Sequence, residues 1–527
     1  MKSLLINVKK FLWPDAVTIR LRRAELTFWA FILAITYLPL PFGFLAWFAM
    51  VRPLAILSEL KGKSVFKAAY FYALMSNIFQ LYWVAIVTPP GAVAAIIILS
   101  LYPAAILAAF VKIYRWRKLW GLMALPFLWV GMEYFRSLSE FTFPWTDLSY
   151  SQGYYLTFIQ IVSIIGSYGL SFILIMLNIF VWQVFNKTNR LEKRVSSVIA
   201  FIGIITVVYL YGWINFPPYP EKGDFKVSLL QGNVDLETKW SSDTRDYNFM
   251  LYDSMAQAAA ADSVDLMVWP ETAAPCYPRL EPKYKKLIAN TAIQSRAYQL
   301  VGAMEIAKSH GTERTFNSAF QFSPDGNMSP AYNKVKLVPF SEHVPYQDYL
   351  PFLTREFLEN YLTFVKTYKV DWWSDFYPGD SAVVFETNKL TYSVLICYES
   401  AFPEYVRECL LKGADFLVNI TNDTWFGRSS GPFQHLRIAV FRAVENRVWI
   451  ARCANSGISA LIDPYGREIV REGLFKQKVV TGNLAELDEY TYFTKHGPIV
   501  AHISLLITCG ILFIIGFIWV SKKFIKY

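Results

Sequence analysis

Long apolar runs alternate with short basic segments over the first 215 residues, and one more apolar run lies near the C-terminal end. Because about 20 apolar residues in a helix cross a bilayer core, each run of roughly this length predicts a membrane span. Eight spans are predicted in this way, over residues 25–39, 41–59, 65–87, 91–111, 119–135, 155–184, 196–215 and 498–521. Pro39 and Pro41 interrupt the first apolar run, so one kinked helix is the alternative for the first two spans.

The pattern changes between the last two predicted spans, where short β-rich runs alternate with segments of helical spacing. Strands are predicted over residues 225–231, 266–269, 299–304, 319–322, 382–387, 392–397 and 416–420, with a hairpin at 463–466. Helices are predicted over 243–261, 281–297 and 432–449. This alternation predicts one large α/β domain with a buried core. The chain is therefore divided into a transmembrane domain (1–215), an α/β domain (216–497), and an eighth span with a tail (498–527).

Composition and charge support this division and suggest an orientation. Hydrophobic residues make up 54% of the 527 residues and charged residues only 17%, which is more apolar than an ordinary soluble protein. Lys and Arg accumulate in short loops on the cytoplasmic side of membranes. Basic clusters precede the first span and lie around residues 61–67, 112–118, 187–194 and 522–526. Both termini are therefore predicted to be cytoplasmic, with the α/β domain on the outer, periplasmic side of a bacterial inner membrane.

The net charge of +10 follows from these clusters at the membrane ends, so no nucleic-acid partner is predicted. The first apolar run lacks a small-residue cleavage site, so we expect it to be kept as an anchor. Five Cys and five His residues are scattered without paired or ligand-like spacing. We therefore expect neither a disulfide framework, a metal site nor a cofactor.

Three residues in the α/β domain offer complementary chemistry. Cys397 ends the apolar run Val394-Leu-Ile-Cys397, Glu271 follows Trp269-Pro270, and Lys334 follows Tyr332-Asn333. A carboxylate can accept a thiol proton, an ammonium can stabilise a thiolate and an oxyanion, and a thiolate can accept an acyl group. Taken singly, each has a plainer reading: an inert buried cysteine, a solvated turn carboxylate, or a lysine on the wet face of a strand.

The α/β domain resembles the nitrilase superfamily, and the whole chain resembles the apolipoprotein N-acyltransferase family of the bacterial envelope. The segments that carry this resemblance are Phe143-Pro-Trp145, Tyr150-Ser-Gln152, Tyr168-Gly-Leu-Ser-Phe172, Gln231-Gly-Asn233, Val268-Trp-Pro-Glu-Thr272, Tyr332-Asn-Lys334, Leu337-Val-Pro-Phe-Ser-Glu342, Cys397-Tyr-Glu399, Asn422-Asp-Thr-Trp-Phe-Gly427 and Asn455-Ser-Gly457. The resemblance implies a four-layer α-β-β-α sandwich joined to a multi-span helical membrane domain.

The resemblance also implies residue roles: Glu271 as general base, Lys334 as oxyanion-stabilising cation and Cys397 as nucleophile. Cys397 would take an acyl chain from a phospholipid, with phosphatidylethanolamine as the expected donor, and form a thioester. The acyl chain would then pass to the N-terminal amine of S-diacylglyceryl-cysteine on an apolipoprotein, giving a triacylated lipoprotein. The alternatives are a membrane-anchored amidase that uses the same three residues, and a non-catalytic scaffold or transporter.

Other residues are candidates for supporting roles. Glu342 and Glu399 resemble family residues that orient Lys334 and the site loop, with a plain ion pair as the alternative for each. Tyr398 is expected to contact substrate, whereas core packing is the alternative for it and the favoured reading of Trp240 and Trp425. His343 beside Glu342 suggests a dyad, but a loop histidine is the commoner outcome.

Residues 345–377 form an aromatic-rich segment, in which Trp372, Trp373 and Phe376 stand together near its end. Aromatic residues in an amphipathic segment favour the membrane interface, where their rings lie beside headgroups. We interpret the segment as a lid that dips into the outer leaflet and admits acyl chains. The alternative is a loop packed on the core of its own domain.

Overall fold

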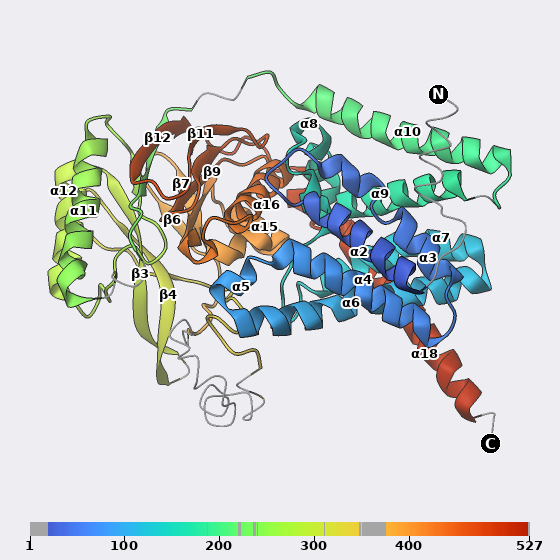
Figure 1. The fold of residues 1–527 in the computed structure, drawn as a ribbon. Helices are drawn as coiled ribbons and strands as arrows, with labels where there is room; N and C mark the ends of the chain where they lie inside the picture. Colours follow the sequence, from blue (N-terminus) through green and yellow to red (C-terminus); the bar gives the residue numbers. More distant parts are fainter. Residues whose placement is uncertain are drawn as a thin grey trace. The chain divides into compact units, whose positions relative to one another are not determined.

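The chain forms two compact units in a computed structural model that describes residues 19–186, 188–219, 223–235, 239, 241–309, 311–346, 349 and 376–524 (Figure 1). The helical unit comprises Met1–Leu138, Pro144–Phe216 and His496–Tyr527, and the second unit comprises Ser139–Phe143 and Pro217–Lys495. The short segment Ser139–Phe143, which the sequence assigned to the helical half, therefore belongs to the second unit.

The helical unit is built from long helices joined by short ones. Its elements are α2 (Ile19–Ile35), η1 (Gly43–Trp47), α3 (Val51–Glu59), α4 (Lys63–Leu81), α5 (Val84–Val87), α6 (Pro89–Trp116), α7 (Lys118–Phe135), η2 (Leu148–Gln152), α8 (Leu156–Ile159), α9 (Val162–Phe185), α10 (Leu191–Asn215) and α18 (Ile499–Phe524). Among the described residues, four helices are long and apolar enough to cross a membrane: Gly91–Trp116, Val162–Phe185, Leu191–Asn215 and Ile499–Ile518. The chain is therefore a membrane protein.

The other four predicted spans remain predictions, and one of them differs from a simple helix. Residues 41–59 contain η1 and the nine-residue helix α3 rather than one continuous helix. At 1.5 Å per residue, α3 extends for about 14 Å, which is about half of a bilayer core. Pro39 and Pro41, the two prolines noted in the sequence, lie in the irregular stretch between α2 and η1.

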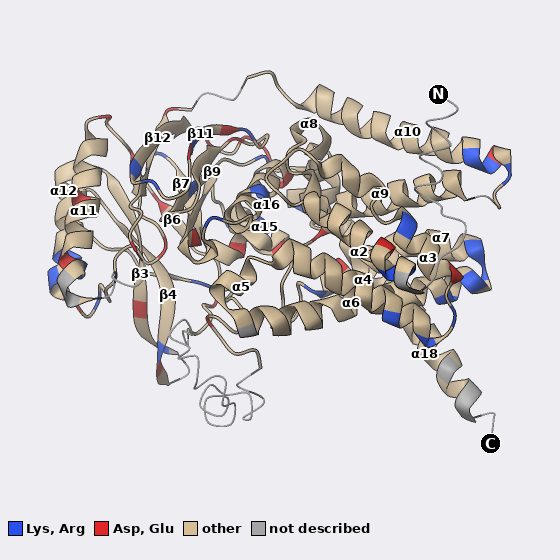
Figure 2. Ribbon diagram, in the orientation of Figure 1, with Lys and Arg blue, Asp and Glu red and all other residues tan. Residues whose placement is uncertain are grey.

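Close helix packing and a polarised charge distribution characterise the helical unit. A Cβ atom on Gly131 of α7 would lie 2.3 Å from Oγ1 of Thr508 on α18, so only glycine permits this approach. The Thr508 hydroxyl donates to the Phe127 carbonyl oxygen at 3.0 Å. Lys and Arg gather at the end of this unit where α6 passes into α7 and α9 into α10 (Figure 2). This clustering accords with the predicted cytoplasmic loops.

The second unit contains two six-stranded sheets. The first has the order β12-β1-β2-β3-β4-β5 and the second β11-β10-β9-β8-β7-β6. The strands are β1 (Phe225–Gln231), β2 (Leu266–Val268), β3 (Tyr298–Ser309), β4 (Thr312–Phe322), β5 (Tyr332–Asn333), β6 (Val384–Glu386), β7 (Thr391–Ile396), β8 (Phe416–Thr421), β9 (Ile450–Ala454), β10 (Ser459–Ile462), β11 (Glu468–Glu472) and β12 (Lys478–Leu484). Pairing is parallel in β1-β2-β3 and in β7-β8-β9.

The two sheets pack face to face, as the contact between Phe225 and Phe416 shows, with ring centroids 5.2 Å apart. Helices α11 (Ser242–Ala260) and α12 (Pro282–Ser295) cover the first sheet, and α15 (Pro403–Leu411) and α16 (Gly431–Asn446) lie on the second (Figure 1). The remaining short elements are η4 (Cys397–Ala401), η5 (Asp423–Phe426) and α17 (Tyr492–His496). The α-β-β-α sandwich predicted from the resemblance is therefore confirmed.

The seven predicted strands and three predicted helices all overlap observed elements, and the predicted hairpin joins β10 to β11. Strands β5, β9 and β12 and helices α15 and α17 were not predicted. Strand β9 carries Arg452 within its buried run, and β5 is only two residues long, so neither has a clear strand pattern. Both become strands through pairing with a neighbour that the local sequence does not specify.

Candidate active site

Strand ends supply the three candidate catalytic residues. Glu271 follows β2, Lys334 directly follows β5, and Cys397 directly follows β7. Thus two of the residues come from the first sheet and the nucleophile candidate from the second. Lys334 Nζ lies 3.5 Å from Glu271 Oε1, and both charges act on the Cys397 thiol. The fold therefore assembles the carboxylate, ammonium and thiol that the sequence singled out.

Lys334 is a buried cation shared between two carboxylates. Its ammonium donates to Glu342 Oε1 at 2.7 Å, and its side chain is 1% exposed. Burial lowers the pKa of Lys334, but the charges of Glu342 and Glu271 outweigh it and raise that pKa above its ordinary value. Glu342 is itself fixed, because its Oε2 accepts from the Val338 N–H at 2.8 Å. Lys334 therefore stays an ammonium, oriented by the residue that the sequence proposed for this role.

The Glu271 carboxylate is held by two donors besides Lys334. Asn317 Nδ2 donates to its Oε1 at 2.8 Å, and the Asn422 N–H donates to its Oε2 at 2.9 Å. Asn317 also donates to Glu342 Oε1 at 3.2 Å, so it connects the two carboxylates that flank Lys334. The sequence analysis missed Asn317. Its only signal there is a polar residue between the apolar Phe316 and Ala319–Phe320 of β4.

Cys397 lies in a strained conformation at the end of its strand. Its φ is +51°, a left-handed value that non-glycine residues rarely adopt and that costs about 1–3 kcal/mol. Burial and the negative charge of Glu271 raise the pKa of the thiol, whereas Lys334 lowers it. The net direction is upward, so the resting side chain is a thiol. Any attack by this sulfur would therefore require a base to remove its proton.

Glu399 connects the turn of Cys397 to the turn of Lys334. Its Oε2 accepts from the Tyr332 hydroxyl at 2.6 Å and from the Ile396 N–H at 2.7 Å. Its Oε1 accepts from the N–H groups of Val335 at 2.7 Å and Lys336 at 3.1 Å. Burial raises the pKa of Glu399 to about 7, even though these donors favour the ionised form. Glu399 thus fixes the chain on both sides of the site.

The aromatic candidates have different positions. Tyr398 is 2% exposed, donates its hydroxyl to the Thr142 carbonyl oxygen at 2.8 Å and stacks on Phe143. These contacts agree with the core-packing alternative for Tyr398. Trp425 is 42% exposed in η5, so it does not pack in the core.

Most of the predicted lid lies outside the described residues. The lid residues Trp372 and Trp373 lie outside the described residues, as does the separate candidate Trp240. The lid residue Phe376 is described, and its N–H donates to the Glu342 carbonyl oxygen at 2.9 Å. His343 lies 3.6 Å from Glu140 on the segment Ser139–Phe143. The lid interpretation therefore stays a prediction.

Lys239 is a further buried lysine beside Glu271. It is 2% exposed, and its Nζ donates at 2.8 Å to Oγ1 of Thr272, the residue that follows Glu271. Burial lowers the pKa of Lys239 to about 7, and the charge of Glu271 opposes this shift. The sequence analysis noted only the neighbouring Trp240, because an isolated lysine in a polar segment carries no signal.

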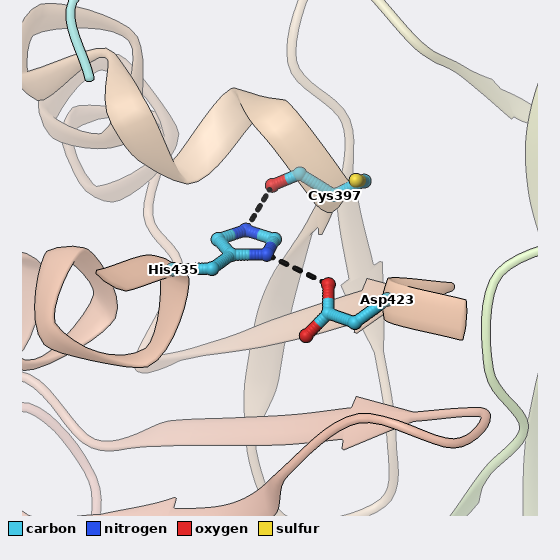
Figure 3. A group of neighbouring side chains, drawn as sticks. All are labelled: Cys397, Asp423 and His435. Atoms are coloured by element: carbon cyan, nitrogen blue, oxygen red, sulfur yellow. Dashed lines mark hydrogen bonds and ion pairs between the residues drawn. The ribbon is translucent and has the colours of Figure 1, made fainter. Parts of the chain in front are cut away.

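One group among the described residues combines residue types that can ligate a metal: Cys397, Asp423 and His435 (Figure 3). His435 Nδ1 lies 2.9 Å from Asp423 Oδ1, and its Nε2 lies 3.0 Å from the Cys397 carbonyl oxygen. Arg452 Nη2 lies 2.7 Å from Asp423 Oδ2 and 3.0 Å from His435 Nδ1. A guanidinium thus already provides the positive charge next to these side chains, which disfavours a metal cation there.

Comparison with known proteins finds a matching protein family for each half of the chain. Residues 226–492 match the carbon-nitrogen hydrolase family, and residues 29–180 match the apolipoprotein N-acyltransferase N-terminal domain. The apolipoprotein N-acyltransferase of Geobacter metallireducens is 34% identical over 473 residues, which cover 87% of this chain and 88% of the relative. That of Rickettsia prowazekii is 32% identical over 399 residues, covering 74% of this chain and 76% of the relative.

Among solved structures, an amidase from Nesterenkonia sp. is 17% identical with a TM-score of 0.37, covering 54% of this chain and 98% of the amidase. A nitrilase-superfamily member from Saccharomyces cerevisiae is 20% identical with a TM-score of 0.36, covering 52% of this chain and 94% of that protein. The extent of the sequence matches, over both the helical and the α/β halves, shows that the chain belongs to the apolipoprotein N-acyltransferase family of enzymes, within the nitrilase superfamily.

Proposed function

We propose that this enzyme transfers an acyl chain from a phospholipid to the N-terminal amine of a diacylated apolipoprotein, through a thioester on Cys397. The observation that carries the proposal is the buried group in which Lys334 lies 2.7 Å from Glu342 and 3.5 Å from Glu271 beside the thiol. Such a group can exchange a proton with the thiol and stabilise an oxyanion without any further cofactor.

In the first half-reaction, Glu271 removes the thiol proton as the Cys397 sulfur attacks the ester carbonyl carbon of the phospholipid. The ammonium of Lys334 and the N–H of Tyr398 stabilise the oxyanion that forms. When the tetrahedral intermediate collapses, the ester C–O bond breaks, and Glu271 returns the proton to the departing alcohol oxygen. The products are the acyl thioester and a lysophospholipid.

In the second half-reaction, the α-amine of the S-diacylglyceryl-cysteine attacks the thioester carbonyl carbon. Glu271 takes a proton from the attacking nitrogen, and the C–S bond then breaks to leave an amide and the cysteine sulfur, which recovers a proton. The two half-reactions share one oxyanion position, so Lys334 serves in both. This order of two half-reactions through a covalent intermediate predicts ping-pong kinetics.

Membrane placement follows from the same proposal. We infer that the α/β unit lies on the periplasmic side of the inner membrane, with both termini in the cytoplasm. The basic end of the helical unit supports this orientation (Figure 2). Trp372, Trp373 and Phe376 are proposed to form part of a lid toward the outer leaflet, where the phospholipid donor, with phosphatidylethanolamine expected, would enter.

The test uses purified enzyme, acyl-labelled phosphatidylethanolamine and a diacylated lipopeptide. The expected result is label in an amide on the lipopeptide, and one acyl group on Cys397 when the lipopeptide is omitted. Glu271→Gln should slow thioester formation by about 100- to 10,000-fold, because it removes the general base. Release of labelled free fatty acid with no amide product would instead support the amidase-type hydrolase, and label on any residue other than Cys397 would refute the thioester.

A further inference from the structure

A side chain from outside its own segment contacts the carbonyl oxygen of Cys397 in its left-handed turn. The Cys397 carbonyl oxygen accepts from Ser400 Oγ at 3.2 Å, within the same short helix η4, and from His435 Nε2 at 3.0 Å. His435 comes from α16, which is distant in sequence, and it is fully buried. A strained residue persists only where its surroundings fix it, so the contact with His435 has a role in holding this turn.

The hydrogen on His435 Nε2 follows from its partner. Nε2 also lies 3.2 Å from Ser400 Oγ, whose hydroxyl donates to the same carbonyl oxygen. A carbonyl oxygen can only accept, so Nε2 must carry a proton for its 3.0 Å contact with Cys397 to be a hydrogen bond. The other ring nitrogen faces both Asp423 Oδ1, at 2.9 Å, and Arg452 Nη2, at 3.0 Å. In the neutral ring it accepts from Arg452, and in the protonated ring it donates to Asp423. The donor toward Cys397 is present in either state.

The partners of His435 are themselves anchored. Arg452 on β9 pairs with Asp423 and also donates from Nε to the Ile458 carbonyl oxygen at 3.2 Å and from Nη1 to the Asn419 side chain. Thr421 Oγ1 donates to Asp423 Oδ1 at 2.9 Å. Each of these groups is almost fully buried. The network therefore links β8 and β9 to the backbone of the nucleophile through one imidazole ring.

The direction of the Cys397 carbonyl sets the direction of a donor. In a planar trans peptide, the C=O of one residue and the N–H of the next point in opposite directions. When the Cys397 carbonyl oxygen points to His435, the Tyr398 N–H therefore points away from His435. Cys397 Sγ lies within 4.8 Å of a ring nitrogen of His435 and of a carboxylate oxygen of Asp423, so the thiol stands beside the network. The Tyr398 N–H is the group that the carbonyl contact turns away from His435.

We propose that His435 is a positioning residue, which aims the Tyr398 N–H at the reaction oxyanion by holding the carbonyl oxygen of Cys397. This inference rests on the proposed thioester chemistry of Cys397. It gives the Asp423–His435–Arg452 network a function that requires no direct contact with substrate. It also predicts that loss of the donor slows reactions that pass through an oxyanion and spares those that do not.

Two reagents separate these reactions at the same sulfur. A p-nitrophenyl ester acylates Cys397 through a tetrahedral oxyanion, with an S–C bond formed and p-nitrophenolate released. Iodoacetamide alkylates the same sulfur by direct displacement of iodide, without an oxyanion. Both rates are measured on the full-length enzyme in detergent, with mass spectrometry to identify the modified residue. The ratio of the two rates reports on the oxyanion donor and is insensitive to the fraction of folded protein.

The variants differ in which ring nitrogen they imitate. His435→Asn keeps a polar group near Nδ1 but has none that reaches Cys397, whereas His435→Gln places an amide N–H near Nε2. His435→Asn should reduce acylation relative to alkylation by about 100-fold, the usual effect of a lost oxyanion donor. His435→Gln should restore the ratio to within about fivefold of the wild type. Ile438→Val, a matched change in the same buried helix, should leave the ratio unchanged.

Several outcomes would overturn the inference. An unchanged ratio in His435→Asn, or an equal ratio in the Asn and Gln variants, would show that His435 only packs. If His435→Asn does not fold, His435→Met removes the same donor in an apolar side chain of similar size and must give the same reduced ratio. A wild-type enzyme that the ester does not acylate at Cys397 would refute the proposed function, and with it this inference.

Discussion

Each unit of the chain buries a cluster of charges, and the two clusters are built differently. In the helical unit, Arg136 pairs with Asp147 at 2.7 Å, and the nearby Glu133 accepts from the Trp129 indole and the Leu148 N–H, both at 2.8 Å. These partners hold the chain near residue 147 against α7. Both carboxylates are bound by donors that do not need to move, so this cluster is suited to a structural role.

In the second unit, one cation serves two carboxylates and faces a thiol. Lys334 interacts with Glu342 and Glu271, and both Lys334 and Glu271 act electrostatically on Cys397. Here a proton can leave the sulfur for Glu271 while the total charge of the buried group stays constant. Burial of charge is thus common to both clusters. The proposed catalytic cluster differs in holding a thiol and a carboxylate that can exchange a proton.

The largest expected effect separates Cys397 from the other buried cysteines. Burial raises the pKa values of Cys276, Cys409 and Cys453 as well, but Cys397 also has Glu271 and Lys334 beside it. Cys397→Ala should reduce acyl transfer by at least about 10,000-fold, because no thioester can form. Cys276→Ala, Cys409→Ala and Cys453→Ala should each retain most activity in the labelled-phospholipid assay. Substantial acyl transfer by Cys397→Ala would show that Cys397 is not the nucleophile.

The next effect concerns the ammonium of the catalytic cluster. Lys334→Arg keeps the positive charge but replaces a compact donor by a larger planar fork, in a site where the side chain is 1% exposed. Thioester formation should fall by about 100- to 1,000-fold, with the loss mainly in kcat. Single-turnover kinetics with labelled phospholipid measures it. Near-normal acylation would mean that Lys334 acts only as a generic charge, like Arg136.

The matching change in the helical unit should affect stability instead. Arg136→Met leaves the buried Asp147 without its cation, which should lower the free energy of unfolding by about 3–5 kcal/mol. Thermal unfolding in detergent reports this as a lower melting temperature, while single-turnover acylation by the folded fraction stays within about twofold of the wild type. Adding Asp147→Asn should recover part of the loss. If Arg136→Met lowers the acylation rate without a change in melting temperature, the structural role assigned to this cluster is wrong.

The smallest expected effect is a shift in the pH dependence of the alkylation rate of Cys397. Because burial and Glu271 raise the pKa of Cys397, the thiolate fraction should still be increasing above pH 8.5, the ordinary cysteine value. The alkylation rate of Cys397 should therefore rise about tenfold per pH unit up to that point. Lys334 lowers this pKa, so Lys334→Met should move the whole profile to higher pH. A profile that levels off below pH 8 would show that the resting side chain is already a thiolate.

Sequence patterns anticipated most of the fold and the carboxylate, ammonium and thiol that the fold brings together. Buried parallel strands such as β7 and β8 are nearly continuous apolar runs, and therefore stand out. Glu271, Lys334 and Cys397 were identified because they interrupt or end such runs in familiar contexts. The supporting residues Asn317, Lys239 and His435 were missed, since each is an isolated polar residue whose partners lie far away in the sequence.

By itself, the sequence determined where apolar runs are long enough for membrane helices, that an α/β region lies between the last two of these runs, and which residue types could carry acyl transfer. These properties depend on neighbouring residues along the chain, so local patterns reveal them. Only the tertiary structure decided that Lys334 is shared by two carboxylates, that Tyr398 anchors to Thr142, and that His435 meets the Cys397 carbonyl. Such contacts join segments tens to hundreds of residues apart, and their distances and orientations arise only when the two sheets pack.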